Sequence, residues 1–328
     1  MRFKLAFAFS LFGILMLVST ANAQNFEGVT GVRDTSYNSV TAFSKDIKKY
    51  PHIELVQEFT FETVSEEREI SYCSEGRRIL KMDVFQNTTQ KDGLRTAIII
   101  IHGGGWRSGD KSQHFPLAQK LASLGYVCFT PEYRLSTEAL FPAAIYDLKS
   151  AIRWVRANAK KYNLNPEKIV ISGFSAGGEL AAFLGTTSNM PLFEGDGCEK
   201  DVSSHVNAII DIDGTLSFVH PDSGEGDDSK GTSAATYWFG YSKKENPMLW
   251  EAASPLGYVG EKTSPTLFIN SSVDRMHTGR DDYMQVLKAN SIYSEVIEFD
   301  TAPHSFVLYH PWFEPMVQGI DDFLNRIF

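Results

Sequence analysis

The sequence is poor in cysteine, in positive charge and in long apolar runs. Its 328 residues include three cysteines, and 31 lysine and arginine residues stand against 40 aspartate and glutamate residues, a formal net charge of −9. Such a chain lacks the basic face that binding to nucleic acid requires. We therefore expect no nucleic-acid partner and no membrane span in the mature chain. The sequence gives no indication of oligomeric state.

The first 23 residues have the pattern of a cleavable export signal. Arg2 and Lys4 precede an apolar run over residues 5–18, and Ala-Asn-Ala at 21–23 is the small-x-small pattern of a cleavage site. The run is shorter than the roughly 20 residues of a spanning helix. We expect cleavage after Ala23 and a secreted or periplasmic protein.

Export bears on the cysteines, because an oxidising compartment permits disulfides. Cys128 lies in an apolar run that reads as a buried strand. Cys73 with Cys198 is therefore the one pairing we consider. None of the three thiols lies in a nucleophile motif, so a cysteine enzyme is disfavoured.

Apolar segments alternate between strand and helix patterns after about residue 66, which predicts a mostly parallel sheet with helices on both faces. The expected strands span 79–85, 96–101, 126–130, 168–172, 206–212, 266–270 and 294–299. The expected helices span 115–124, 142–162, 176–186, 280–289 and 311–327.

Three regions complete the expected organisation: a leader over 24–65, a catalytic domain over 66–328, and within it an insertion over 215–260. An insertion of this length between sheet elements is usually a functional loop or cap, so we assign it to the substrate site. Its acidic stretch fits either a solvated loop or a calcium loop. The carboxylates concerned are those of Asp222, Glu225, Asp227 and Asp228.

Two glycine-rich motifs carry the chemistry. Gly-Phe-Ser-Ala-Gly at 173–177 follows a predicted buried strand and precedes a predicted helix, the context of a nucleophile elbow. Ser175 is the predicted nucleophile. His-Gly-Gly-Gly-Trp at 102–106 follows another buried strand, and successive glycines let backbone amides approach a developing oxyanion. The predicted donors are the amides of Gly104, Gly105 and Ala176.

A serine nucleophile needs a base and an acid, which follow it in the order acid, then histidine, in this arrangement. His304 lies between the last predicted strand and the last helix, whereas His277 comes too soon after its strand and His310 stands at the start of the last helix. For the acid we expect Asp274, just past the strand 266–270. Two further carboxylates compete, those of Asp281 and Asp282, which are more simply explained as charges in a first helical turn.

The expected substrate contacts are Trp106, Phe174 and Trp238. Stacking on a sugar or an aromatic acyl group and packing in the core are equally good accounts of Trp238, Phe239 and Trp312. We expect no cofactor and no metal in the reaction.

These motifs resemble the α/β-hydrolase family, in particular its hormone-sensitive-lipase-like and bacterial carbohydrate-esterase branch, over about residues 68–328. The Glu-Tyr-Arg-Leu segment at 132–135 adds to the resemblance. The family implies an eight-stranded, mostly parallel sheet and ester hydrolysis through an acyl-enzyme. Segments 309–315 and 251–256 are similar to exported bacterial esterases that act on pectin and hemicellulose. Glu179 departs from the family, because many relatives carry asparagine or another small polar residue there.

The expected function is a secreted acetyl esterase that deacylates plant cell-wall xylan or pectin. A feruloyl esterase or a general short-chain esterase would use the same machinery. A peptidase is disfavoured because no added domain admits peptides. A non-catalytic binding module on a hydrolase scaffold is the alternative from another class, although such proteins usually lose the serine or the histidine.

Overall fold

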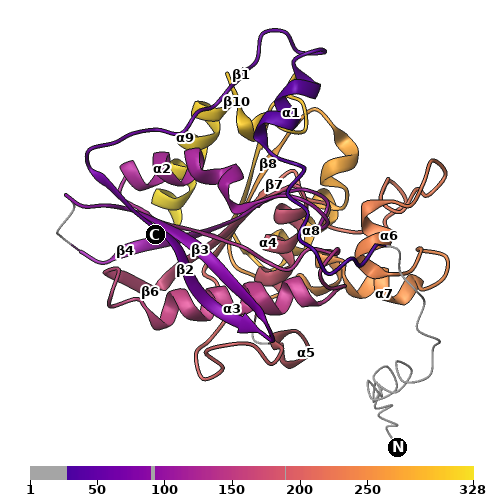
Figure 1. Cartoon of the computed structure of the whole chain (residues 1–328), viewed down its shortest axis with the longest axis horizontal. Helices are drawn as coiled ribbons and strands as arrows, with labels where there is room; N and C mark the ends of the chain where they lie inside the picture. Colours follow the sequence, from indigo (N-terminus) through magenta and orange to yellow (C-terminus); the bar gives the residue numbers. More distant parts are fainter. Residues whose placement is uncertain (1–27, 90–92, 189) are drawn as a thin grey trace, which may run out of the picture.

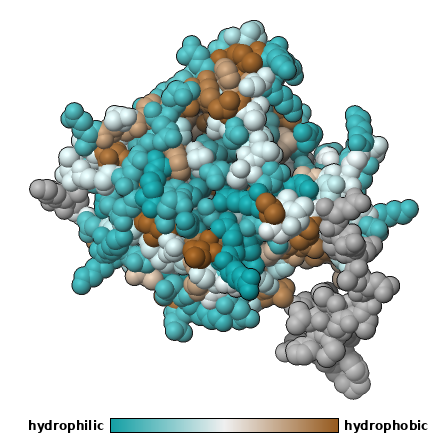
Figure 2. Space-filling view, in the orientation of Figure 1, coloured by the Kyte–Doolittle hydropathy of each residue, from teal (hydrophilic) through white to brown (hydrophobic). Residues whose placement is uncertain are grey.

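The computed structural model describes residues 28–89, 93–188 and 190–328 (Figure 1). The predicted export signal and its cleavage site lie outside these ranges. Among the described helices, none has the length and apolar character needed to cross a bilayer. The face shown in Figure 2 is mainly hydrophilic, with hydrophobic side chains in small separate groups.

The centre of the molecule is an eight-stranded sheet in the order β2-β3-β5-β4-β6-β7-β8-β9. The strands from β5 to β9 pair in parallel, while β2 with β3 and β3 with β5 are antiparallel. The strands are β2 (Val64–Glu75), β3 (Arg78–Asn87), β4 (Arg95–Ile101), β5 (Val127–Pro131), β6 (Leu164–Phe174), β7 (Ala208–Ile212), β8 (Thr266–Asn270) and β9 (Ser294–Glu298). The predicted α/β-hydrolase sheet is confirmed.

Alternation along the central strands divides the core into two layers. Ile98 and Ile100 of β4 pack in one cluster with apolar residues of α2 and α9, whereas Ile99 and Ile101 pack in another with residues of α3 and α4. Successive side chains of a strand point to opposite faces, so a continuous apolar run indicates burial on both sides. The five longer helices are α2 (Phe115–Ser123), α3 (Ala143–Ala157), α4 (Ala176–Thr186), α8 (Arg280–Ala289) and α9 (Phe313–Ile327).

Several elements have no counterpart among those expected from sequence. The edge strand β2 is mostly half-buried or exposed, so its residues lack the apolar pattern of the central strands. A two-stranded sheet pairs Leu55 of β1 with Tyr309 of β10, far apart in the chain, and β10 contains His310, which was expected at a helix start. The elements concerned are α1 (Ser39–Asp46), β1 (Glu54–Leu55), α5 (Pro191–Glu194), α6 (Ala234–Phe239), α7 (Pro247–Ala252) and β10 (Tyr309–His310).

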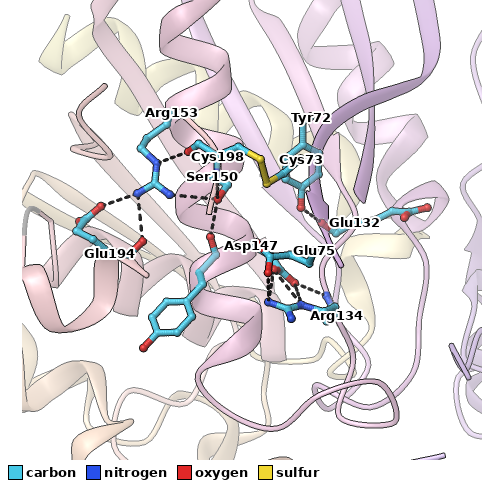
Figure 3. Close-up of a disulfide and its surroundings, with 11 residues drawn as sticks. Tyr72, Cys73, Glu75, Glu132, Arg134, Asp147, Ser150, Arg153, Glu194 and Cys198 are labelled. Atoms are coloured by element: carbon cyan, nitrogen blue, oxygen red, sulfur yellow. Dashed lines mark hydrogen bonds and ion pairs between the residues drawn. A yellow bond between two sulfur atoms is a disulfide. The ribbon is translucent and has the colours of Figure 1, made fainter. Parts of the chain in front are cut away.

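Cys73 of β2 forms a disulfide with Cys198, which follows α5 (Figure 3). The expected pairing is confirmed, and Cys128 is a buried free thiol. Beside the bridge, the guanidinium of Arg153 donates to the carbonyl of Cys198 at 2.9 Å and pairs with Glu194 at 2.9 Å. The disulfide therefore fixes the loop after α5 to the edge of the sheet.

Candidate active site

Ser175 lies at the sharp turn between β6 and α4. Its backbone has φ 57° and ψ −121°, and its amide donates to the carbonyl of Ile212 at 2.8 Å. A Cβ on Gly173 would approach the carbonyl oxygen of Gly177 to 2.0 Å, so the turn requires glycine. From residue 171 to residue 180, every residue is buried except Ser175, which is partly exposed. This is the strained elbow that the motif predicts.

Three side chains form a hydrogen-bonded row at this turn. The hydroxyl of Ser175 lies 2.8 Å from Nε2 of His304, and Nδ1 of His304 lies 2.8 Å from Oδ2 of Asp213. With its proton on Nδ1, the imidazole donates to the carboxylate and accepts the serine proton at Nε2. The His304 side chain is 25% exposed and that of Asp213 is fully buried. The row therefore runs from an accessible nucleophile, Ser175, to a buried acid, Asp213.

The carboxylate in this row is not the one expected from sequence. Asp274 is exposed and begins a short 3-10 helix, Asp274–His277, beyond β8. Its carboxylate makes no hydrogen bond or ion pair with the residues that the structure describes. The prediction of Asp274 as partner of His304 is therefore wrong, and Asp213 takes that place. Asp281 and Asp282 lie in the first turn of α8, as expected.

Sheet topology explains the correction. Phe174 of β6 pairs with Ile212 of β7, so the residues that follow these two, Ser175 and Asp213, leave the sheet side by side. The strand β8 lies one position further away. The chain after β8 does not supply the acid but binds it. The amide of Ser271 donates to Oδ1 of Asp213 at 2.8 Å, and the Ser271 hydroxyl donates to Oδ2. An aspartate directly after a buried strand was the sequence signal for Asp213.

The glycine loop lies against the nucleophile. A Cβ on Gly103 would be 3.1 Å from Cβ of Ser175. The amide of Gly103 is bonded to Oε1 of Gln113 at 2.9 Å, whereas no hydrogen bond within the described ranges uses the amide of Gly104 or Gly105. Ala176 is the first residue of α4, where an amide has no acceptor within the helix. These three amides remain our predicted oxyanion donors.

Neighbouring residues fix this loop in place. Tyr133, in the segment 132–135, donates its hydroxyl to the carbonyl of His102 at 3.0 Å and stacks on the imidazole, with ring centroids 4.5 Å apart. Burial lowers the pKa of His102 to about 4, so the ring is neutral near pH 7. A Cβ on Gly104, at φ 126°, would collide with the carbonyl of Ser108. His102 and Tyr133 therefore support the loop.

The three expected substrate contacts are buried. Phe174 and Trp238 are fully buried and Trp106 is 4% exposed. Phe174 packs on His304, with ring centroids 4.9 Å apart, and Trp106 stacks on Trp238 of α6, at 4.9 Å and 6° between planes. In this structure they support the catalytic loops and form no open wall. Trp238 is therefore better explained by core packing than by stacking on a substrate. The sequence alone could not distinguish these two roles.

The insertion borders the glycine loop. Ala234, the first residue of α6, would lie 3.0 Å from a Cβ on Gly105. The acidic stretch of this insertion caps the chain around α6: Asp228 accepts the amide of Ser233 at 2.7 Å and the hydroxyl of Thr236 at 3.0 Å. Within the described part of the chain, no group of three or more acidic, histidine or cysteine side chains is placed to hold a metal ion.

Comparison with known proteins gives one matching family and many related esterases. The family described as BD-FAE matches residues 82–280. Esterase LipQ of Mycobacterium tuberculosis is 28% identical over 266 residues, which are 79% of this chain and 62% of that protein. The chain thus spans less than two thirds of that relative.

Solved structures extend the comparison. A truncated carbohydrate esterase from gut microbiota superposes with a TM-score of 0.66 at 25% identity, over 82% of this chain and all of that one. An esterase from Thermogutta terrifontis, solved with butyrate bound, gives a TM-score of 0.65 at 25% identity, over 81% of this chain and 95% of that one. Both likenesses agree with the α/β-hydrolase architecture described above.

Proposed function

The chain belongs to the BD-FAE family, and on that basis we propose that it is a serine carboxylic-ester hydrolase that works through an acyl-enzyme. The observation that carries the proposal is the row of Ser175, His304 and Asp213, joined by two contacts of 2.8 Å. A serine hydroxyl is a weak nucleophile unless an adjacent base removes its proton. The distance of 2.8 Å from Nε2 of His304 to the Ser175 hydroxyl supports this role for the imidazole.

In the first half-reaction, Oγ of Ser175 attacks the ester carbonyl carbon while its proton passes to Nε2 of His304. Asp213 stabilises the imidazolium that forms. The oxyanion is held by the predicted backbone donors, each worth about 10²–10³ in kcat. The bond to the alcohol then breaks as His304 returns the proton to the leaving oxygen. Water repeats the same steps on the acyl-enzyme, releasing the acid and restoring Ser175.

The proposed substrate is an acetylated plant cell-wall polysaccharide, xylan or pectin, met after export. Two observations support it: the export-signal pattern of residues 1–23, and the likeness to a carbohydrate esterase. A general short-chain esterase is the second candidate, favoured by the related Thermogutta terrifontis esterase that was solved with butyrate. Feruloyl ester hydrolysis remains the third alternative.

A substrate panel separates these candidates. Acetate release from acetylated xylan or pectin at kcat/KM well above that for p-nitrophenyl butyrate would support the polysaccharide. Preference for the small synthetic ester over every polymer would favour a short-chain esterase. Preferential hydrolysis of methyl ferulate would assign the feruloyl activity.

The nucleophile is tested by Ser175→Ala. We expect turnover of p-nitrophenyl acetate to fall by roughly 10⁵–10⁶-fold, the loss typical of a triad nucleophile, and labelling by a fluorophosphonate probe to disappear. Ser172→Ala is the matched control, because this buried serine lies three residues earlier on β6 and its hydroxyl has no partner among the described residues. Turnover retained in S175A, or a wild-type protein that the probe never labels, would contradict the proposal; the latter result favours a binding module.

A further inference from the structure

Glu179 is a buried carboxyl that the reaction above does not use. It lies in the first turn of α4, four residues after the nucleophile, and its amide donates to the carbonyl of Ser175 at 3.0 Å. Its side chain is fully buried and extends to the oxyanion loop, where Oε2 accepts the indole N–H of Trp106 at 2.8 Å. One hydrogen bond thus joins the helix of the nucleophile to the loop of the glycines.

A buried carboxyl group at this position lowers the stability of the fold. Burial raises the pKa of Glu179 well above its usual value, and the nearby carboxyl of Asp211 raises it further. Its second oxygen, Oε1, has no hydrogen-bond partner among the described residues. A buried polar atom without a partner costs about 1–3 kcal/mol. An apolar side chain of the same size would avoid that cost, so packing alone does not explain glutamate here.

Trp106 makes three further contacts besides its hydrogen bond to Glu179. Its ring stacks on Trp238 and lies 5.4 Å from the ring of Phe218, and its carbonyl accepts the amide of Ser136 at 2.7 Å. Its backbone is in the left-handed region, at φ 57°, which few non-glycine residues adopt. Because Trp106 directly follows Gly105 in the chain, a shift of its backbone would also move the peptide planes before it.

We propose that Glu179 is a positioning residue, which through Trp106 fixes the amides of the oxyanion loop relative to Ser175. The inference rests on the proposed ester hydrolysis and explains why a glutamate occupies this buried position. Oxyanion donors act only when they are already aimed at the place where charge develops. Displacements of about 1 Å at such a site can cost 10²-fold in rate. The hydrogen bond to Trp106 would prevent that displacement.

The test uses Glu179→Met, which keeps the volume and removes the acceptor, Glu179→Gln, which keeps an acceptor oxygen, and Trp106→Phe, which removes the donor. On p-nitrophenyl acetate we expect E179M and W106F to lower kcat by roughly 10–100-fold with KM within about twofold. We expect E179Q to recover most of kcat. The double variant should be no slower than the slower single variant, because both break one bond.

A readout specific to the oxyanion loop completes the test. A trifluoromethyl ketone adds to Ser175 and places an oxyanion on the loop amides, so its inhibition constant should rise in E179M by the same factor as kcat falls. Ser172→Ala, which removes a buried hydroxyl without a partner among the described residues, should leave that constant unchanged. Wild-type kcat and inhibitor affinity in E179M, or in W106F if E179M does not fold, would overturn the inference while S175A still reports on the nucleophile. Loss of thermal stability without loss of inhibitor affinity would overturn it as well.

Discussion

Asp213 combines a constrained backbone with a fully bonded carboxylate. Its φ is 54°, and its amide donates to the carbonyl of Ile269 at 3.0 Å. The carboxylate accepts from Ser271 twice and from His304 once. A buried carboxylate with three donors cannot rotate without losing a bond that burial makes costly to lose. His304 is therefore held in one orientation and one tautomer.

This arrangement predicts opposite outcomes for two aspartates. Asp213→Asn should lower kcat on p-nitrophenyl acetate by roughly 10⁴-fold, because the amide can hold the imidazole in the wrong tautomer. Asparagine also tolerates positive φ, so the fold should survive. Asp274→Asn, at an exposed position, should stay within about twofold of wild type. The reverse ranking in steady-state kinetics would restore Asp274 as the acid.

The two ends of the triad differ in how far sequence determines them. Ser175 and His304 occupy positions fixed by local pattern, an elbow motif and a loop between the last strand and the last helix. The acid depends on which neighbouring strand supplies it. Both Asp213 and Asp274 follow buried parallel strands. The spacing of apolar residues in the sequence does not show which of these strands, β7 or β8, lies beside β6. The choice needed the register between Phe174 and Ile212.

At the scale of elements, the leader is tied to the catalytic loops. The carbonyl of Asp34 accepts the amide of Gly109 at 3.0 Å, and the amide of Tyr37 donates to the hydroxyl of Ser108 at 2.9 Å. Arg33 pairs with Glu132 at 2.6 Å. The leader thus packs on the chain that follows the glycines of the predicted oxyanion loop.

Three elements, β8, α4 and α8, begin and end at the predicted residues, whereas α3 ends at Ala157, before the predicted residue 162, and β6 extends beyond the predicted 168–172 at both ends. The elements that were not predicted from the sequence are ones whose stability comes from packing against their neighbours. Strand β2 is an edge strand with a half-buried pattern, and α6 and α7 are six-residue helices within an insertion. Such short helices depend on tertiary packing more than on their own propensity.

The disulfide gives a prediction at this scale. It closes a chain segment of 125 residues between β2 and the loop after α5, and a loop of this length gives a stabilisation of about 2–5 kcal/mol. The double variant Cys73→Ala/Cys198→Ala should therefore unfold at a lower temperature, by about 5–10 °C, as measured by calorimetry.

The control for this prediction uses the wild-type protein itself. Dithiothreitol should lower the melting temperature of wild type toward that of the double variant and should leave the double variant unchanged. Cys128 is buried and unpaired, so it offers no alternative bridge. Equal melting temperatures with and without reductant would show that the bridge adds nothing to stability.

Across the whole molecule, buried titratable groups act on stability in two directions. Burial lowers the pKa of His102 to about 4 and that of His114 to about 3. Burial raises the pKa values of Glu179 and Asp211 well above the usual carboxyl range. The stability from the two carboxyls is complete below their unfolded pKa values, near 4, and is lost as pH rises. The histidines act oppositely, because the stability that depends on their neutral form is lost as pH falls from about 6.5 toward their lowered pKa values.

His114 gives the sharpest test of this balance. In the unfolded chain its imidazole takes up a proton near pH 6.5, whereas the folded chain accepts it only near pH 3. As pH falls from 6.5 toward 3, the unfolded state binds more protons, and the free energy of unfolding declines by up to about 1.4 kcal/mol per pH unit for each such histidine. His114→Leu removes one of the two. Urea unfolding followed by circular dichroism should then show a shallower decline between pH 6 and pH 4.5 than wild type. Equal slopes would mean that His114 takes up its proton in the folded protein.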